Sequence, residues 1–198
     1  MKTLGLIGSG HIGGVLARLA VDAGLDVVLS NSRDPQTLSG LVRELGPRAR
    51  AATPAQAAAA GDWVVVTIPV GAVGTVPAEP LAGKTVIDTG NYWAPRDGAI
   101  PELEARELTD SELLQRHLTG AHVVKAFNNI NYQHLEALPR PVGAADRTAC
   151  RSPATIRARR RRPPSWFPCS GTTSWTWGRS PKAGARKRAV RPSARPTR

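Results

Sequence analysis

Three spaced glycines directly after an apolar segment limit this chain to a small number of folds. Residues 4–7 have the sequence Leu-Gly-Leu-Ile, and Gly8, Gly10 and Gly13 follow in the spacing G-x-G-x-x-G. In this spacing the first glycine allows a tight turn, the second lets a pyrophosphate approach the backbone, and the third lets a helix pack closely. We therefore predict a strand, a dinucleotide-binding turn, and a helix near residues 12–23 whose free N–H groups point at the phosphates.

The same stretch has a competing interpretation, a secretory signal peptide, because Lys2 precedes a mostly apolar run. Arg18 and Asp22 interrupt that run, and no clean small-residue cleavage site follows it. The dinucleotide-binding turn is therefore the favoured interpretation.

The residues after the second apolar segment indicate which dinucleotide the turn binds. Residues 26–30 form a second predicted strand, and Asn31, Ser32 and Arg33 follow it. An NAD site usually has an acidic residue here, which accepts hydrogen bonds from the ribose hydroxyls. An amide, a hydroxyl and a guanidinium instead suit the 2′-phosphate of NADP, since the planar guanidinium matches phosphate oxygens. The alternative is a polar loop in which Arg33 is solvated or pairs with Asp34.

Helix-like and strand-like segments then alternate along the chain. Expected helices cover residues 38–45 and 54–60, and expected strands cover residues 62–69, 84–88 and 122–127. The β-branched run within 62–69 is too continuous for a half-exposed strand and suits one buried on both faces. Repeated strand–helix units of this length imply right-handed crossovers. We therefore predict an α/β fold with one doubly wound, mostly parallel, Rossmann-like sheet.

Four motifs make the chain similar to a known family. They are residues 8–13 (Gly-Ser-Gly-His-Ile-Gly), 31–33 (Asn-Ser-Arg), 87–91 (Ile-Asp-Thr-Gly-Asn) and 124–129 (Val-Lys-Ala-Phe-Asn-Asn). Over residues 1 to about 148 the chain resembles the F420-dependent NADP reductases and their dinucleotide-binding relatives. The last two motifs are the more specific ones, because Rossmann domains in general do not share them.

The resemblance implies hydride transfer between NADP(H) and a deazaflavin, coenzyme F420, or a similar small acceptor. Both reacting carbons belong to cofactors and the protein mainly aligns them, so we expect no catalytic acid or base and no metal. The resemblance also implies that residues of this chain contact the pyrophosphate and the 2′-phosphate, and that others lie along the nucleotide toward the nicotinamide. The complete set of expected cofactor-binding residues is Gly8, Ser9, Gly10, His11, Ile12, Gly13, Asn31, Ser32, Arg33, Ile68, Pro69 and Asn91.

The last quarter of the chain differs in composition from the rest. All 15 acidic residues lie within residues 1–148, whereas residues 149–198 hold 14 of the 27 basic residues and no leucine. We therefore expect an NADP-binding domain over residues 1–148 and a basic tail over residues 149–198. High net charge with little aliphatic material predicts that the tail is disordered.

Two functional interpretations of the tail follow from its residues. Clustered arginines at 159–162 and interleaved tryptophans fit an arm that binds nucleic acid. Cys150 and Cys169 suggest a metal site or a disulfide. The absence of paired C-x-x-C motifs disfavours the metal, and the reducing cytosol expected for an NADP enzyme disfavours the disulfide.

A third interpretation explains more of the tail: a base missing near codon 149, after which the gene is translated out of frame. The original frame is restored by joining the last base of each codon to the first two bases of the next codon. In that frame the genetic code allows only Asp at the codon that spans Trp175 and Thr176. It also forces Gly across Trp177 and Gly178, and residues 149–157 allow Leu-Pro-Ile-Ala-Gly-Asp-Asp-Pro. The amino-acid sequence in this alternative frame is acidic and has the alternation of a strand. We therefore favour a frameshift over an evolved basic arm, and nucleic acid is a disfavoured partner.

Three functions therefore stay open at the level of sequence. They are an NADP-dependent oxidoreductase impaired by loss of its native C-terminal region, a non-catalytic NADP-binding or sensing module, and a nucleic-acid-binding protein. No apolar run in the sequence is long enough to span a membrane, so we expect a cytoplasmic location and small-molecule partners. The sequence leaves the identity of the hydride acceptor and assembly into homo-oligomers undetermined.

Overall fold

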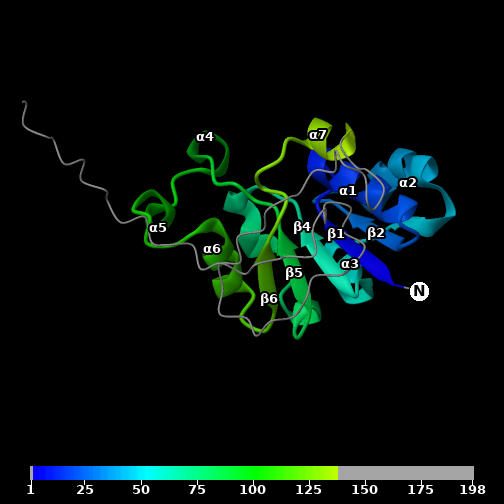
Figure 1. Cartoon of the computed structure of the whole chain (residues 1–198). Coiled ribbons are helices and arrows are strands. Elements are labelled where there is room, and N and C mark those ends of the chain that lie inside the picture. Colours follow the sequence, from blue (N-terminus) through cyan, green and yellow to red (C-terminus); the bar gives the residue numbers. More distant parts are fainter. Residues whose placement is uncertain (1, 138–198) are drawn as a thin grey trace, which may run out of the picture.

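The structure, a computed structural model, describes residues 2–137. Six parallel strands form one sheet in the order β3-β2-β1-β4-β5-β6 (Figure 1). The strands are β1 (Thr3–Ile7), β2 (Asp26–Ser30), β3 (Ala49–Ala51), β4 (Trp63–Val66), β5 (Thr85–Asp88) and β6 (His122–Lys125). This order confirms the predicted Rossmann-like fold. The expected boundary at residue 148 and the tail over residues 149–198 lie outside the described residues.

The helices connect successive strands. The α-helices are α1 (His11–Asp22), α2 (Ser39–Leu45), α3 (Pro54–Ala60), α4 (Ala94–Asp97), α5 (Pro101–Glu104), α6 (Asp110–His117) and α7 (Tyr132–Ala137). Short 3-10 helices are η1 (Pro35–Leu38), η2 (Gly46–Arg48), η3 (Val70–Thr75) and η4 (Glu79–Leu81). None of the helices described is long and apolar enough to cross a membrane.

The two faces of the sheet have separate hydrophobic cores. On one face, Leu6 and Val65 pack with side chains of α1, α2 and α7. On the other face, Val64 and Val66 pack with side chains of α6 and of the 3-10 helices. Successive residues of β4 therefore point into opposite cores, which explains why its sequence is apolar without alternation.

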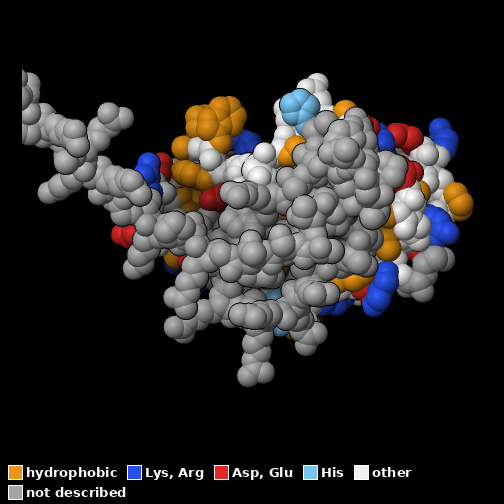
Figure 2. Space-filling view, in the orientation of Figure 1, with side chains coloured by type: hydrophobic (Ala, Val, Ile, Leu, Met, Phe, Trp, Pro, Cys, Tyr) orange, Lys and Arg blue, Asp and Glu red, His pale blue; other side chains and the backbone are white. Residues whose placement is uncertain are grey.

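Two predicted strands are shorter than expected. The strand predicted over residues 62–69 ends at Val66, and the one predicted over residues 122–127 ends at Lys125. In the second case Phe127 has a φ of 60°, which breaks the extended conformation while its side chain stays buried. On the face of the molecule in Figure 2, a hydrophobic patch lies over α4, beyond the carboxyl ends of β4, β5 and β6 (Figure 1).

Candidate functional site

The first glycine of the motif lies in a turn that tolerates no side chain. Gly8 has a φ of 104°, and a Cβ at this position would lie 2.6 Å from the Thr67 carbonyl oxygen. The Gly8 N–H donates to the Ser30 carbonyl (3.0 Å), and the Thr67 hydroxyl donates to the Gly8 carbonyl (2.8 Å). The turn is therefore fixed between the ends of β2 and β4.

The other two glycines of the motif meet opposite surroundings. A Cβ on Gly13 would collide with the Gly8 carbonyl oxygen and lie 2.9 Å from the Thr67 hydroxyl, whereas a Cβ on Gly10 would meet no atom within 4 Å. Gly10 is also the N-cap of α1 and supplies no side-chain hydrogen bond to the first-turn N–H groups. The first turn of α1 therefore has no side-chain cap, and the space beside Gly10 is open, an arrangement that suits a phosphate.

The three residues between these glycines have different environments. The Ser9 hydroxyl donates to the Ser30 carbonyl (2.8 Å), and Ile12 packs against the core below α1. The exposed His11 ring stacks on Tyr132 of α7, with ring centroids 4.6 Å apart and planes 18° apart. Contact of these residues with a pyrophosphate stays a prediction; the structure adds Tyr132, which the sequence motifs did not indicate.

The predicted 2′-phosphate residues lie at the carboxyl end of β2. The Asn31 side-chain oxygen accepts from the Arg33 N–H (2.9 Å), so the loop folds back on itself. Ser32 and Arg33 are exposed. The Asp34 carboxylate caps η1 by accepting from the Gln36 N–H (2.7 Å), and no ion pair within residues 2–137 involves Arg33. The alternative of local pairing between Arg33 and Asp34 is therefore not what the structure shows.

The residues predicted along the nucleotide follow β4. Ile68 is half-buried and packs against the core, and Pro69 is exposed and is the N-cap of η3. The Thr67 N–H donates to the Ile7 carbonyl (2.8 Å), so this segment leaves the sheet beside the glycine turn. β1 and β4 are the neighbours at which the strand order reverses, and ligands of open α/β sheets bind in the crevice at that point.

Two asparagines meet beyond the ends of β5 and β6. The Asn91 side-chain amide donates to the Asn128 backbone carbonyl (2.7 Å). The side-chain oxygen of Asn128 is buried and has no hydrogen-bond partner among residues 2–137. A buried acceptor without a donor is costly, so Asn128 offers an acceptor to a ligand with N–H groups.

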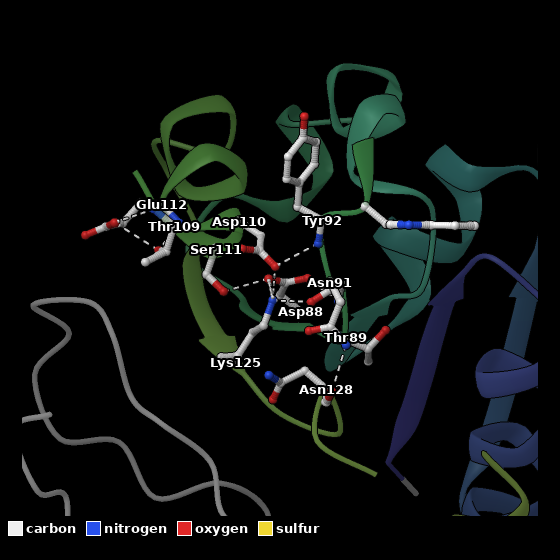
Figure 3. Close-up of polar contacts among 12 residues, drawn as sticks. Asp88, Thr89, Asn91, Tyr92, Thr109, Asp110, Ser111, Glu112, Lys125 and Asn128 are labelled. Atoms are coloured by element: carbon white, nitrogen blue, oxygen red, sulfur yellow. Dashed lines mark hydrogen bonds and ion pairs between the residues drawn. The ribbon is translucent and has the colours of Figure 1, made fainter. Parts of the chain in front are cut away.

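A buried ionic cluster fixes the loop that carries Asn91. The Lys125 ammonium contacts Asp88 (3.0 Å), Asp110 (3.2 Å) and the Gly90 carbonyl oxygen, and the Ser111 hydroxyl donates to Asp88 (2.6 Å) (Figure 3). The side chains of Lys125 and Asp88 are 8% and 6% exposed. The Lys125 cluster, defined as the four side chains of Lys125, Asp88, Asp110 and Ser111, joins the end of β5, the start of α6 and the end of β6.

A second buried carboxylate holds the other side of this loop. The Arg96 guanidinium donates to both oxygens of Asp97 (2.9 and 2.8 Å), and the Trp93 N–H donates to the same carboxylate (2.8 Å). The Arg96 guanidinium, helped by the N–H groups of Trp93 and Gly71, holds the pKa of Asp97 below its usual range. Because Gly71 follows Pro69, Asp97 connects α4 to the loop after β4.

The structure thus brings the predicted cofactor residues to one edge of the sheet. The glycine turn, the Asn31–Arg33 loop, Ile68 and Pro69 follow β1, β2 and β4, and Asn91 follows β5. The motifs did not indicate that Lys125, Asp88 and Asp110 would form a cluster, although Asp88 ends a predicted strand and Lys125 lies within another. No group of three metal-ligating side chains occurs within the described part of the chain.

Comparisons with known proteins agree with this geometry. Residues 3–92 match the family described as NADP oxidoreductase, coenzyme F420-dependent. A candidate F420-dependent NADP reductase from Arthrobacter sp. FB24 is 26% identical, with a TM-score of 0.63 over 79% of this chain and 74% of that one. A hypothetical protein from Sinorhizobium meliloti is 28% identical, with a TM-score of 0.61 over 71% of this chain and 68% of that one.

A more distant structure shares the fold alone. It is the 3-hydroxyisobutyrate dehydrogenase of Mycobacterium tuberculosis, 22% identical with a TM-score of 0.52 over 77% of this chain and 46% of that one. A comparison with curated protein sequences gave no significant match. The family match confirms the resemblance that the sequence motifs carry and supports an NADP-binding oxidoreductase. Residues 3–92 are therefore similar to the family of F420-dependent NADP oxidoreductases.

Proposed function

We propose that this protein binds NADP(H) and transfers a hydride between it and a deazaflavin such as coenzyme F420, or a similar small acceptor. The observation that carries the choice of NADP is the exposed Arg33, which has no ion pair within residues 2–137 and lies in a loop without the usual acidic residue. An acidic residue there would repel a 2′-phosphate, whereas Ser32 and Arg33 supply hydrogen-bond donors for it.

We infer that the rest of the dinucleotide lies along the carboxyl ends of the strands, from the Asn31–Arg33 loop past the glycine turn. The open space over Gly10 and the uncapped start of α1 suit the pyrophosphate. Ile68, Pro69 and Asn91 border the nicotinamide end, where the unpartnered Asn128 oxygen would accept a hydrogen bond from the carboxamide.

The residues of this chain act by alignment in the proposed reaction. Bound NADPH supplies the hydride, and the acceptor takes up one proton to complete its two-electron reduction. The Lys125 cluster and Asp97 hold the loop at the nicotinamide end, which keeps the acceptor at a fixed position and limits water. Such positioning is the main contribution a protein makes when both reacting carbons belong to small molecules.

The proposed function includes an effect of the predicted frameshift on activity. The native residues after codon 149 would help to wall the acceptor side, so we expect cofactor binding to be better preserved than turnover. A cytoplasmic location agrees with the use of NADP.

The test of cofactor choice is a calorimetric titration of the whole chain with NADPH and with NADH. In Arg33→Ala we expect about a 10- to 100-fold loss of NADPH affinity, since charge-assisted hydrogen bonds contribute about 1.5–3 kcal/mol each. NADH affinity should stay unchanged. Arg43→Ala is the matched control, because Arg43 is an exposed arginine in the last turn of α2.

Equal losses of NADPH and NADH affinity in Arg33→Ala would contradict the 2′-phosphate assignment. Turnover is tested separately by the reduction of F420 with NADPH, which is measured as the loss of deazaflavin fluorescence. Tight NADPH binding with no reduction of F420 or another small acceptor would favour the non-catalytic module instead.

A further inference from the structure

Trp93 is an exposed aromatic side chain beside the candidate site. It is 60% exposed and is the large hydrophobic residue that stands out from the surface within residues 2–137. It is also the N-cap of α4, and Figure 2 shows a hydrophobic patch over that helix. A single exposed aromatic residue is common on protein surfaces. What distinguishes Trp93 is the way its backbone is held.

The backbone around Trp93 is fixed on both sides. The Trp93 N–H donates to Asp97, whose side chain has no exposed surface (0%). The preceding N–H, that of Tyr92, donates to Asp110 of the Lys125 cluster (3.2 Å), and the Tyr92 hydroxyl donates to the Gly98 carbonyl (2.9 Å). A rigid loop therefore presents an indole to solvent, so a ligand that packs on the ring loses little loop entropy.

Trp93 also lies between the two segments that border the nicotinamide end. Arg96, which binds Asp97, also donates to the Asn91 backbone carbonyl (2.7 Å). Asp97 in turn accepts from the N–H of Gly71, two residues after Pro69. A Cβ on Gly71 would collide with the Asp97 backbone carbonyl, so α4 packs directly on the loop that follows β4. The backbone that carries the indole is thereby tied to the Asn91 carbonyl and to Gly71 in the loop after Pro69, and Asn91 and Pro69 are cofactor-binding residues in the proposed function.

We propose that Trp93 is the surface on which the hydride acceptor stacks, and that it makes the site selective for planar heteroaromatic acceptors over aliphatic carbonyl compounds or imines. This inference rests on the proposed function and names the acceptor class of the same site. An indole face gains from offset stacking on a flat conjugated ring, whereas a puckered aliphatic ring gains only area burial. Substitution of Trp93 changes acceptor binding and leaves NADP binding unchanged.

The experiment is a calorimetric titration of the whole chain, saturated with NADP⁺, with F420 and in parallel with cyclohexanone. Trp93→Ala should weaken F420 binding about tenfold, as expected for loss of one stacking contact, while Trp93→Phe should retain most of the affinity. The control for removal of an indole elsewhere is Trp63→Phe, since Trp63 begins β4 at the amino ends of the strands. NADP⁺ affinity should be the same in all three variants as in the wild-type chain, and the thermal midpoint should be unchanged in the two Trp93 variants.

The outcomes separate this inference from the proposed function. If the wild-type chain does not bind NADP⁺, the proposed function fails. If it binds NADP⁺ but not F420, or if Trp93→Ala binds F420 as tightly as the wild-type chain, the inference about Trp93 is wrong and NADP binding stands. Equal losses in Trp93→Ala and Trp93→Phe, or a Trp93-dependent preference for cyclohexanone, would also overturn it.

Discussion

Single charged residues fix the loop that carries Asn91, and they do so by binding backbone groups as well as each other. Lys125 contacts the Gly90 carbonyl, and Asp88 accepts from the Gly90 N–H (2.8 Å). The Lys125 ammonium, which has three donors, contacts Asp88, Asp110 and the Gly90 carbonyl. Burying these charges costs free energy that offsets much of their attraction. The contacts join the loop after β5 to α6 and β6.

Asp97 leads to a prediction about pH. Its pKa is lowered in the folded protein, so the unfolded chain binds this proton more tightly. Stability from Asp97 is then complete above the unfolded pKa of about 3.9 and is lost as the pH falls through the lower folded value. Asp97→Asn should cost about 1–3 kcal/mol near neutral pH and flatten this part of the acid dependence.

Urea unfolding at a series of pH values between about 7 and 3 measures both effects. Asp22→Asn is the control, because Asp22 is exposed at the end of α1. A difference between Asp97→Asn and the wild-type chain that does not shrink on acidification would show that the carboxylate charge is not what stabilises the loop.

Among the elements, α1 and its glycine turn depend on backbone approach that side chains would prevent. Gly13 and Gly14 are adjacent and both buried in the helix. A Cβ on Gly13 would collide with the Gly8 carbonyl, whereas a Cβ on Gly14 would meet only the tip of Arg18 at 3.6 Å. The two positions therefore separate the general cost of glycine in a helix from the special requirement of the turn.

We expect Gly13→Ala to destabilise the protein by about 1–3 kcal/mol, since the turn must move to accommodate the methyl group. Gly14→Ala should be neutral or stabilising by about 0.5–1 kcal/mol, because alanine is the better helix former. Urea unfolding compares the two variants. Similar stabilities for both would mean that the turn gives way easily and that close packing is not the reason for Gly13.

Sequence patterns predicted some elements to the residue and missed others. The strand at Asp26–Ser30 and the helix at Pro54–Ala60 have the predicted bounds, because continuous apolar character and a Thr53 capping box define them locally. The strand Ala49–Ala51 and the four-residue helices α4 and α5 were not predicted. They are too short to show a hydrophobic period and form because neighbouring elements hold them.

At the scale of the whole molecule, the sheet is buried on both faces, and residues 149–198 differ in charge from the rest of the sequence. The described residues have cores on both faces of the sheet. All 12 of the excess positive charges, and more, come from residues 149–198, which hold no acidic residue. A C-terminal region that extends an α/β sheet has apolar segments, and residues 149–198 hold few aliphatic residues. The frameshift hypothesis therefore predicts that the chain in the restored frame has a larger hydrophobic core.

The frameshift is tested by sequencing the gene around codon 149. We expect one missing base, and a continuous alternative frame with Asp across Trp175 and Thr176. A chain translated in the restored frame should have a higher thermal midpoint and faster NADPH oxidation, because it buries more apolar surface. An early stop codon in the alternative frame, or an unchanged midpoint and rate, would refute the prediction.

The sequence by itself determined the parallel α/β class, the glycine turn after the first strand and the resemblance to a family. These depend on local rules: glycine spacing, strand ends and continuous apolar strands act through neighbours along the chain. Only the tertiary structure decided that Lys125 joins Asp88 to Asp110, that Asp97 connects α4 to Gly71, and that Asn91 meets Asn128. The physical reason is that these contacts join segments distant in sequence, and side-chain pairing across strand ends leaves no periodic signal in the chain.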